Sequence, residues 1–204
     1  MEIVVIDYGL GNLTSVYNAL KYIGAKAKIS SLPGDIKKSG KLVLPGVGSF
    51  QDSVIGLKKR DIFGLIKDLM LRGKPYLGIC LGLQILFEKS QEGKMGGFGI
   101  FKGNVKRFSE KNNIKVPHIG WNSVKVAPKP QSFSIMDGIE NDSYFYFDHS
   151  YYPAPEDKNI IAATTDYGVE FPSAIHKDNI YAVQFHPERS QKLGLRLLEN
   201  FVKL

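Results

Sequence analysis

The sequence contains very little cysteine: Cys80 is the only one among 204 residues. A single cysteine cannot form an internal disulfide, so we expect a cytoplasmic protein, because thiols stay reduced in that compartment. A secretory signal is not visible either, since "MEIVVIDYG" carries an acidic residue at position 2 and its apolar run is short. No apolar stretch approaches the roughly 20 residues that cross a bilayer, so we expect no membrane partner.

Acidic residues are fewer than basic ones, and the formal net charge is +7. The lysines are nevertheless scattered, and the densest cluster, "KKR" at 58–60, has no aromatic residues interleaved for base stacking. This pattern is typical of a lysine-rich solvated surface. We therefore expect no nucleic-acid partner.

A complete dinucleotide-binding fingerprint is also missing. Gly9 and Gly11 in "DYGLGN" follow an apolar run and precede a helical pattern, but Thr14 stands where the third glycine belongs. No acidic residue ends the second predicted strand, where it would bind a ribose hydroxyl. The glycines therefore predict a tight turn. We expect no cofactor and no metal.

The first half of the chain alternates short apolar runs with helical patterns. Four strands are predicted, at 2–7, 25–30, 41–46 and 74–80. The predicted helices span 12–23, a short segment from Pro33, 50–72 as one broken or two short helices, and 81–90. Strands that alternate with helices pair in parallel. The sequence thus predicts an α/β protein with a doubly wound, flavodoxin-like mixed sheet flanked by helices.

The second half, from residue 93 to 185, is richer in strand-forming and turn residues. Strands are predicted at 143–152 and 159–168, and a hairpin over 173–185 is predicted to turn at Asp178–Asn179. An amphipathic helix over 190–204 follows. Because no linker or repeat interrupts the chain, we predict one domain over residues 1–204.

The residues around Cys80, "GICLG", have the form of a nucleophile elbow with cysteine as the nucleophile. Such a sharp turn from strand to helix needs glycine two residues to either side, and Gly78 and Gly82 meet that need. The turn would place the sulfur at a helix N-terminus, where the dipole favours the thiolate. The alternative is an inert, buried cysteine in a binding module of the same fold.

A nucleophile needs a base, and His186 is the best candidate among the four histidines because it begins "HPE". Glu188 can accept a hydrogen bond from one ring nitrogen and leave the other facing Cys80, which makes a Cys–His–Glu triad. The glycine loop "LPGVGSF", at 44–50, can offer backbone N–H groups to a developing oxyanion. The N–H of Leu81 would be a second donor.

Together these motifs resemble the class I glutamine amidotransferases, and within them the glutaminase subunits of imidazole glycerol phosphate synthase, an enzyme of histidine biosynthesis. The elbow and "HPE" are typical of the wider family, while "DYGLGN", "PHIGWN" and "HSYY" select this branch. The resemblance covers essentially the whole chain. It implies that Cys80 attacks the side-chain amide of glutamine, that His186 protonates the departing ammonia, and that water hydrolyses the resulting thioester.

The resemblance also implies further site residues and a partner. Glutamine or its oxyanion would be held by Gly46, Gly48, Gln84, Glu92, Ser150 and Tyr151. The partner would be a (β/α)₈-barrel cyclase subunit that forms a heterodimer with this chain and receives ammonia through a tunnel. The positions that match its interface are Asn12, Tyr146 and Arg189.

Two positions depart from the family pattern. Asp148 stands where valine is usual, and Arg189 stands where lysine is common. Neither belongs to the predicted triad, but both leave open a paralogous glutaminase that supplies ammonia to another synthase, for example in amino- or amidino-sugar assembly. A cysteine hydrolase that works alone is the other enzymatic alternative.

Overall fold

The structure, a computed structural model, describes residues 1–109, 114–128 and 133–204. Within these residues, the main sheet contains β1 (Ile3–Ile6), β2 (Ala27–Ser30), β3 (Lys41–Gly46), β4 (Tyr76–Cys80), β7 (His118–Val126), β8 (Ser143–His149), β10 (Ile161–Asp166), β11 (Glu170–Lys177) and β12 (Ile180–Val183). A smaller sheet contains β5 (Phe87–Ser90), β6 (Phe101–Arg107) and β9 (Tyr151–Pro155).

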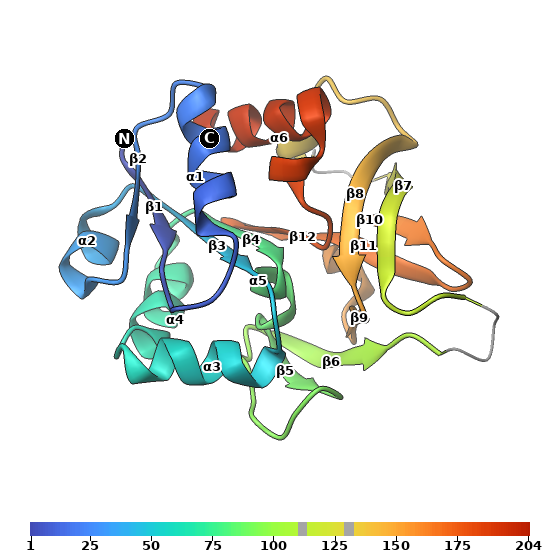
Figure 1. Cartoon of the computed structure of the whole chain (residues 1–204), viewed down its shortest axis with the longest axis horizontal. Helices are drawn as coiled ribbons and strands as arrows, with labels where there is room; N and C mark the ends of the chain where they lie inside the picture. The colour runs from blue at the N-terminus through green and yellow to red at the C-terminus, as the bar shows by residue number, and fades with distance from the viewer. Residues whose placement is uncertain (110–113, 129–132) are drawn as a thin grey trace.

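The main sheet is mixed, with the strand order β2-β1-β3-β4-β12-β11-β10-β7-β8 (Figure 1). The neighbours from β2 to β12 are parallel, whereas the neighbours from β12 to β8 are antiparallel. This arrangement confirms the α/β fold with a mixed sheet. Its parallel half places the carboxyl ends of β1, β3, β4 and β12 at one edge, where functional groups are expected to gather.

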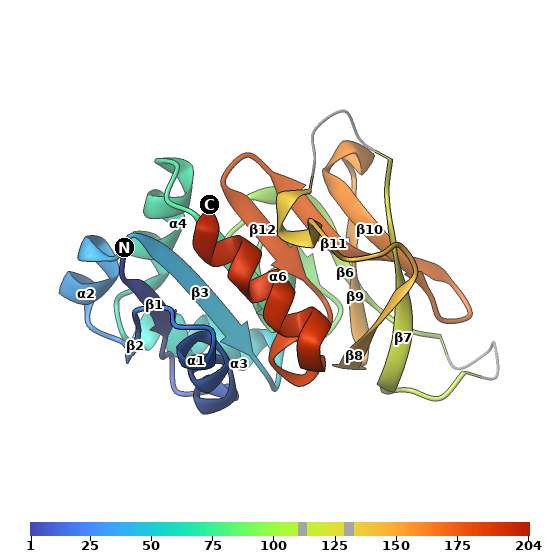
Figure 2. The same cartoon turned by 90° about the horizontal axis from the view of Figure 1, so that it is seen from above.

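Helices cover both faces of the parallel half (Figure 1, Figure 2). They are α1 (Leu13–Tyr22), α2 (Pro33–Lys38), α3 (Phe50–Lys59), α4 (Phe63–Leu71), α5 (Leu81–Gln84) and α6 (Gln191–Lys203). Side chains alternate along a strand, so Val5 of β1 packs with α1 and α6 through Val16 and Leu197. The preceding Val4 packs on the opposite face with Val54 of α3. Residues 50–72 thus form two short helices, and β1 is buried on both faces, as its continuous apolar run predicts.

The helix predicted over residues 81–90 is wrong. α5 ends at Gln84, and the chain enters β5, which pairs in parallel with β6 through Phe87 and Phe101. Both phenylalanines are buried. Pairing with a later strand therefore overrides the local helical pattern, because the long-range pairing buries these rings in the second sheet.

The single strand predicted over residues 143–152 is wrong as well. The chain leaves the main sheet at the end of β8, and after Ser150 it enters β9 of the smaller sheet. β8 pairs with β7 and β9 pairs with β6, so two different partners divide the segment. Ser150 and Tyr151 consequently lie at the junction between the two sheets.

The other predicted elements are present near their expected bounds. The first two residues of the strand predicted at 159–168 belong to a 3₁₀ turn at Lys158–Ile160, and the extended part is β10. The hairpin of β11 and β12 turns at Asp178–Asn179, as predicted, with a positive φ of 53° at Asp178. Residues 110–113 and 129–132 of the strand-rich region lie outside the described residues. Among the described helices, none is long and apolar enough to cross a membrane.

One buried lysine fastens the last helix to the sheet. Lys41, at the start of β3, is 5% exposed. Its ammonium group donates to the carbonyl oxygens of Phe201 and Val202, each at 2.8 Å. These carbonyls belong to the last turn of α6, where the helix itself supplies no donor.

Lys41→Met is expected to lower the free energy of unfolding by about 1–3 kcal/mol, because it leaves two helix-end carbonyls without a donor. Urea denaturation of the variant measures this loss. Lys192→Met, which removes an exposed lysine from the same helix, is the control and should change stability by less than about 0.5 kcal/mol. Equal losses in the two variants would contradict this role for Lys41.

Candidate active site

Cys80 ends β4 in a strained backbone conformation, with φ 54° and ψ −103°. Residues other than glycine rarely adopt a positive φ. A Cβ at Gly78 would lie 2.5 Å from the carbonyl oxygen of Gly82, and a Cβ at Gly82 would overlap the carbonyl oxygen of Leu44. Tyr76 lies beneath the turn and donates its hydroxyl to the carbonyl of Gly82 at 2.8 Å. The sharp turn predicted at Cys80 is therefore present, and it needs both glycines.

The helix after Cys80 is shorter than predicted, and this changes the electrostatics of the sulfur. α5 contains four residues, from Leu81 to Gln84. The dipole of one helical turn is small because it sums over few peptide units. Charge near the sulfur therefore comes mainly from the side chains around it.

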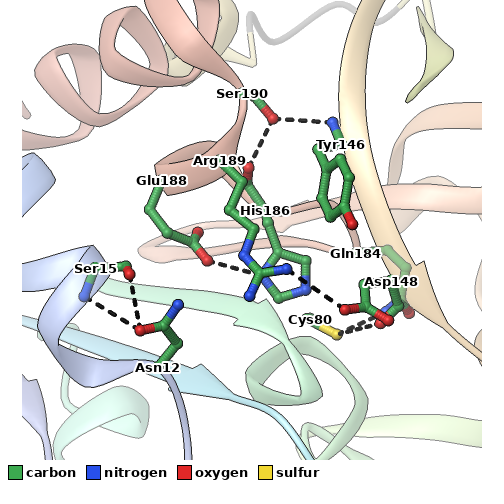
Figure 3. A network of polar contacts seen from close by, with 10 residues as sticks. All are labelled: Asn12, Ser15, Cys80, Tyr146, Asp148, Gln184, His186, Glu188, Arg189 and Ser190. Atoms are coloured by element: carbon green, nitrogen blue, oxygen red, sulfur yellow. Dashed lines mark hydrogen bonds and ion pairs between the residues drawn. The ribbon is translucent and has the colours of Figure 1, made fainter. Parts of the chain in front are cut away.

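The imidazole of His186 lies between Glu188 and Cys80 (Figure 3). Its Nδ1 donates to Oε1 of Glu188 at 2.8 Å, and the two side chains are only 3% and 1% exposed. Burial disfavours the imidazolium, but the Cys80 thiolate and the Glu188 carboxylate outweigh it and raise the pKa of His186 to about 10. Among the described residues, Nε2 of His186 has no hydrogen-bond partner. This nitrogen is therefore available to a reacting group.

Two further groups contact the sulfur, and the sequence did not single out either contact. The side-chain amide of Gln184, which is fully buried, donates from Nε2 to Sγ of Cys80 at 3.5 Å. Sγ also lies 3.9 Å from the backbone carbonyl oxygen of Asp148. The sequence offered one signal for Gln184: it is the single polar residue in the otherwise apolar "YAVQF", just before "HPE".

Cys80 faces a cavity of about 350 Å³. Of the residues predicted to bind glutamine or its oxyanion, those lining this cavity are Gly48, Leu81, Gln84, Glu92, Ser150 and Tyr151. A larger cavity of about 580 Å³ lies elsewhere and is lined by His176 and Asp178, remote in sequence from the elbow. We assign the chemistry to the smaller cavity because it contains the candidate nucleophile.

Gly46 differs from the other residues predicted to bind glutamine or its oxyanion, because it is buried and does not line the cavity. It pairs with Cys80 across β3 and β4. A Cβ at this position would lie 2.6 Å from both Cβ of Leu81 and the hydroxyl of Tyr8. Gly46 therefore allows the glycine loop to pack directly against the elbow. The loop continues through Gly48, which has a positive φ of 100°.

Glu92 and Gln84 are held by backbone contacts at the cavity wall. The Glu92 carboxylate accepts from the N–H of Phe50 at 2.6 Å, and burial raises its pKa. Gln84, which is 3% exposed, donates from Nε2 to the carbonyl of Tyr151 at 2.9 Å and to Oε1 of Gln184 at 3.1 Å. A carboxylate fixed in this way suits the ammonium group of an amino acid.

The positions predicted for a partner interface lie close to this site. Asn12 caps α1, and its side-chain oxygen accepts from the Ser15 hydroxyl at 2.8 Å (Figure 3). The Arg189 guanidinium lies 5.5 Å from the ring centre of Tyr146. Trp121, which is 46% exposed, packs edge-on against the same ring. Sequence reasoning did not single out Trp121, although it is the only tryptophan and lies in the quoted motif "PHIGWN".

Two buried histidines, of which His149 lines the cavity, form a chain of hydrogen bonds. Asn122 Nδ2 is 3.3 Å from His118 Nε2, His118 Nδ1 is 3.1 Å from His149 Nε2, and His149 Nδ1 is 2.7 Å from the carbonyl oxygen of Tyr151. Neutral rings with the proton on Nδ1 satisfy every contact, since each Nε2 then accepts. Burial lowers the pKa of His118 to about 4 and that of His149 to about 3.

The sequence of this chain matches one protein family over nearly its whole length. The family model described as glutamine amidotransferase class-I matches residues 4–204. The chain is 49% identical to the imidazole glycerol phosphate synthase subunit HisH of Caldanaerobacter subterraneus, over 97% of this chain and 95% of the relative. It is 45% identical to subunit HisH of Acinetobacter baylyi, over 99% and 98% of the two chains. Subunit HisH 2 of Pseudomonas aeruginosa is also 45% identical, over 99% of each chain.

Solved structures share the fold at lower sequence identity. The PurLQS structure from Thermotoga maritima matches with a TM-score of 0.78 at 18% identity, over 99% of this chain and 97% of that one. The glutaminase domain of CTPS from Trypanosoma brucei matches with a TM-score of 0.67 at 16% identity, over 100% and 94% of the two chains. At these identities the likeness confirms the fold class.

Gly82→Ala is expected to destabilise the protein by about 3 kcal/mol, because the new Cβ would overlap the backbone carbonyl of Leu44. Urea denaturation measures the loss. Gly64→Ala in α4 is the matched control, since a Cβ there meets open space. It should be neutral or stabilise by up to about 1 kcal/mol. Similar stabilities for the two variants would show that the elbow does not depend on Gly82.

The buried histidine pair is expected to make stability fall with acid between pH 6.5 and 5. In this window the unfolded chain protonates both histidines, while His118 and His149 stay neutral in the fold because their pKa values are lowered. The unfolded state then binds more protons, so stability rises with pH by about 3 kcal/mol across the window, about half from each histidine. The measurement is the free energy of unfolding against pH. His149→Gln should flatten this slope, and an unchanged slope would contradict the assignment.

Proposed function

The chain belongs to the class-I glutamine amidotransferase family, and we propose that it is the glutaminase subunit of an imidazole glycerol phosphate synthase. Near-full-length relatives with 43–49% identity carry this subunit name, which supports the assignment. The observation that carries the chemistry is the line of Glu188, His186 and Cys80, in which Cys80 lines the cavity. The proposal takes residues 1–204 as one amidotransferase domain acting in the cytoplasm, without a cofactor or metal.

In the first half of the reaction, the Cys80 thiolate attacks the side-chain amide carbon of glutamine. The amide oxygen gains the negative charge, and the N–H groups of Gly48 and Leu81 are the proposed donors to it. The proton on Nε2 of His186 passes to the departing nitrogen, and ammonia leaves as the thioester forms. Glu188 holds Nδ1, which keeps the ring oriented while Nε2 exchanges its proton.

In the second half, His186 removes a proton from water through Nε2, and the hydroxide attacks the thioester carbon. The carbon–sulfur bond breaks, so glutamate is released and Cys80 returns as the thiolate. Glu92 is proposed to bind the ammonium group of the substrate, and Gln84, Ser150 and Tyr151 line the pocket that orients it. Tight positioning matters here because correct geometry supplies much of the rate enhancement.

The proposed partner is a (β/α)₈-barrel cyclase subunit that consumes the ammonia. Free ammonia in neutral water is mostly protonated and is then no nucleophile, so transfer between closely docked subunits preserves its reactivity. Asn12, Tyr146 and Arg189 are proposed to lie in this interface. The exposed Trp121 extends the same surface, since its ring packs against Tyr146. The exposed aromatic side chain is of the kind that interfaces favour.

Cys80→Ala is expected to lower glutamine hydrolysis at least roughly a thousandfold, since it removes the nucleophile. Glu188→Gln should lower it at least about a hundredfold, because the ring of His186 loses its orienting carboxylate. Ammonia release by the complex with its cyclase partner measures both effects. His176→Gln is the control, because His176 lies in β11 and outside this cavity, and it should leave turnover unchanged.

Labelling and partner dependence complete the test. A glutamine-like electrophile such as diazo-oxo-norleucine should modify Cys80, and the isolated chain should hydrolyse glutamine slowly, because the family couples hydrolysis to the partner's ligand. Unchanged ammonia release by Cys80→Ala would overturn the proposed chemistry. Hydrolysis of peptides instead of glutamine would support a hydrolase that works alone, and coupling to a different synthase would support a paralogue.

A further inference from the structure

Asp148 occupies an unusual place, because it contacts the nucleophile and a charged neighbour at once. It is the penultimate residue of β8, and its backbone carbonyl oxygen is 3.9 Å from Sγ of Cys80. Its carboxylate forms an ion pair with Arg189, with Oδ2 at 3.5 Å from Nη1. Figure 3 shows the Arg189 guanidinium reaching toward the Asp148 carboxylate, with the sulfur of Cys80 close by.

Arg189 belongs to the turn that carries the proposed base. It follows Glu188 directly, and its N–H donates to the carbonyl of His186 at 3.1 Å. Its guanidinium also lies over the ring of Tyr146, which is two residues before Asp148 and so shares the same face of β8. One side chain of the turn thus contacts two successive outward side chains of the strand.

Backbone contacts already fix β8 to this turn, but they act at Tyr146. The N–H of His186 donates to the carbonyl of Tyr146 at 2.8 Å, and the N–H of Tyr146 donates to the hydroxyl of Ser190 at 3.0 Å. The ion pair extends the connection two residues toward Cys80. It therefore reaches the part of the strand whose carbonyl contacts the sulfur.

The ion pair also affects the charge near Cys80. Asp148 belongs to the lining of the cavity that contains Cys80, and its carboxylate is half-exposed. An uncompensated carboxylate at this wall would oppose both a thiolate and the carboxylate of an incoming amino acid. Arg189 supplies the opposite charge beside it. Among the described residues, the other titratable side chains around Cys80 and His186 are Tyr8, Glu92, His149, Tyr151 and Glu188.

We infer that Asp148 and Arg189 are a positioning pair for the nucleophile. The ion pair holds the Cys80 end of β8 against the turn of His186, and the guanidinium compensates the carboxylate beside the sulfur. The inference rests on the proposed function only in taking Cys80 as the nucleophile. Because both side chains are 40% exposed, the pair contributes little to global stability, and its effect is local.

Alkylation of the full chain by iodoacetamide tests the pair, and the single cysteine makes the reaction specific. The reagent is neutral, so the pH midpoint of its reaction reports the ionisation of the coupled Cys80–His186 pair. Arg189→Gln leaves a carboxylate alone and should raise the midpoint by about half a pH unit. Asp148→Asn leaves a guanidinium alone and should lower the midpoint by a similar amount. The double variant should return close to the unsubstituted protein.

Arg196→Gln is the matched control, since Arg196 pairs with Glu199 on α6 at comparable exposure but away from the cavity. It should leave the midpoint unchanged. Arg189→Lys keeps the charge and should also leave it nearly unchanged. Shifts of the same sign in Arg189→Gln and Asp148→Asn would overturn the inference, because loss of structure alone moves both variants in one direction. Shifts no larger than that of Arg196→Gln would overturn it too.

Glutamine hydrolysis by the complex with the cyclase gives a second readout. Arg189→Gln should lower kcat/KM severalfold, and adding Asp148→Asn should recover most of the loss, so the two changes are not additive. Additive losses would contradict the pairing. If the unsubstituted complex releases no ammonia from glutamine, the proposed function fails, whereas the alkylation midpoints still decide whether the pair tunes Cys80.

Discussion

The strained turn at Cys80 is the constraint on which the site depends. A cysteine at φ 54° is held there only because the surrounding backbone leaves no alternative. Such strain costs of order 1–3 kcal/mol and must be offset by the neighbouring structure. Here the offset comes from the parallel pairing of β3 and β4, from the close approach of Gly82 to Leu44, and from the Tyr76 hydroxyl. The turn presents the sulfur at the carboxyl edge of the sheet, and the glycine loop packs beside it.

The strand order then brings the base to the sulfur across a hundred residues of sequence. β12 lies next to β4 in parallel, with Val183 opposite Ile79. One step further along the two chains, Gln184 reaches Cys80 with its side-chain amide. The turn that begins at His186 follows at once, and Pro187 starts its 3₁₀ segment. Insertion of β12 next to β4 therefore places a hydrogen-bond donor and a base within reach of one sulfur.

Local motifs predicted the turn at Cys80 and the contact between His186 and Glu188, whereas contacts that depend on long-range strand pairing could not be predicted. The elbow glycines and "HPE" are short patterns whose geometry follows from the residues themselves, so Cys80, His186 and Glu188 could be chosen from the sequence. The helix predicted over 81–90 failed because the partner of β5 is a later strand, which no local pattern reveals. Gln184 was missed because a polar residue in an apolar strand has many possible partners. Only the strand order, which sets β12 beside β4, shows that its partner is Cys80.

Two buried histidines near the sulfur have pKa values that are shifted in opposite directions. His186 and His149 are both buried, and burial disfavours a charged ring at each. His186 faces Cys80 and the Glu188 carboxylate, which together outweigh burial and raise its pKa. His149 faces a neutral ring and the carbonyl of Tyr151, so it stays neutral and acts through hydrogen bonds. That carbonyl also accepts from Gln84, so the neutral histidine and the cavity wall share one acceptor. The fold thus separates a buried histidine whose pKa is raised from one whose pKa is lowered and whose two ring nitrogens are both used in hydrogen bonds.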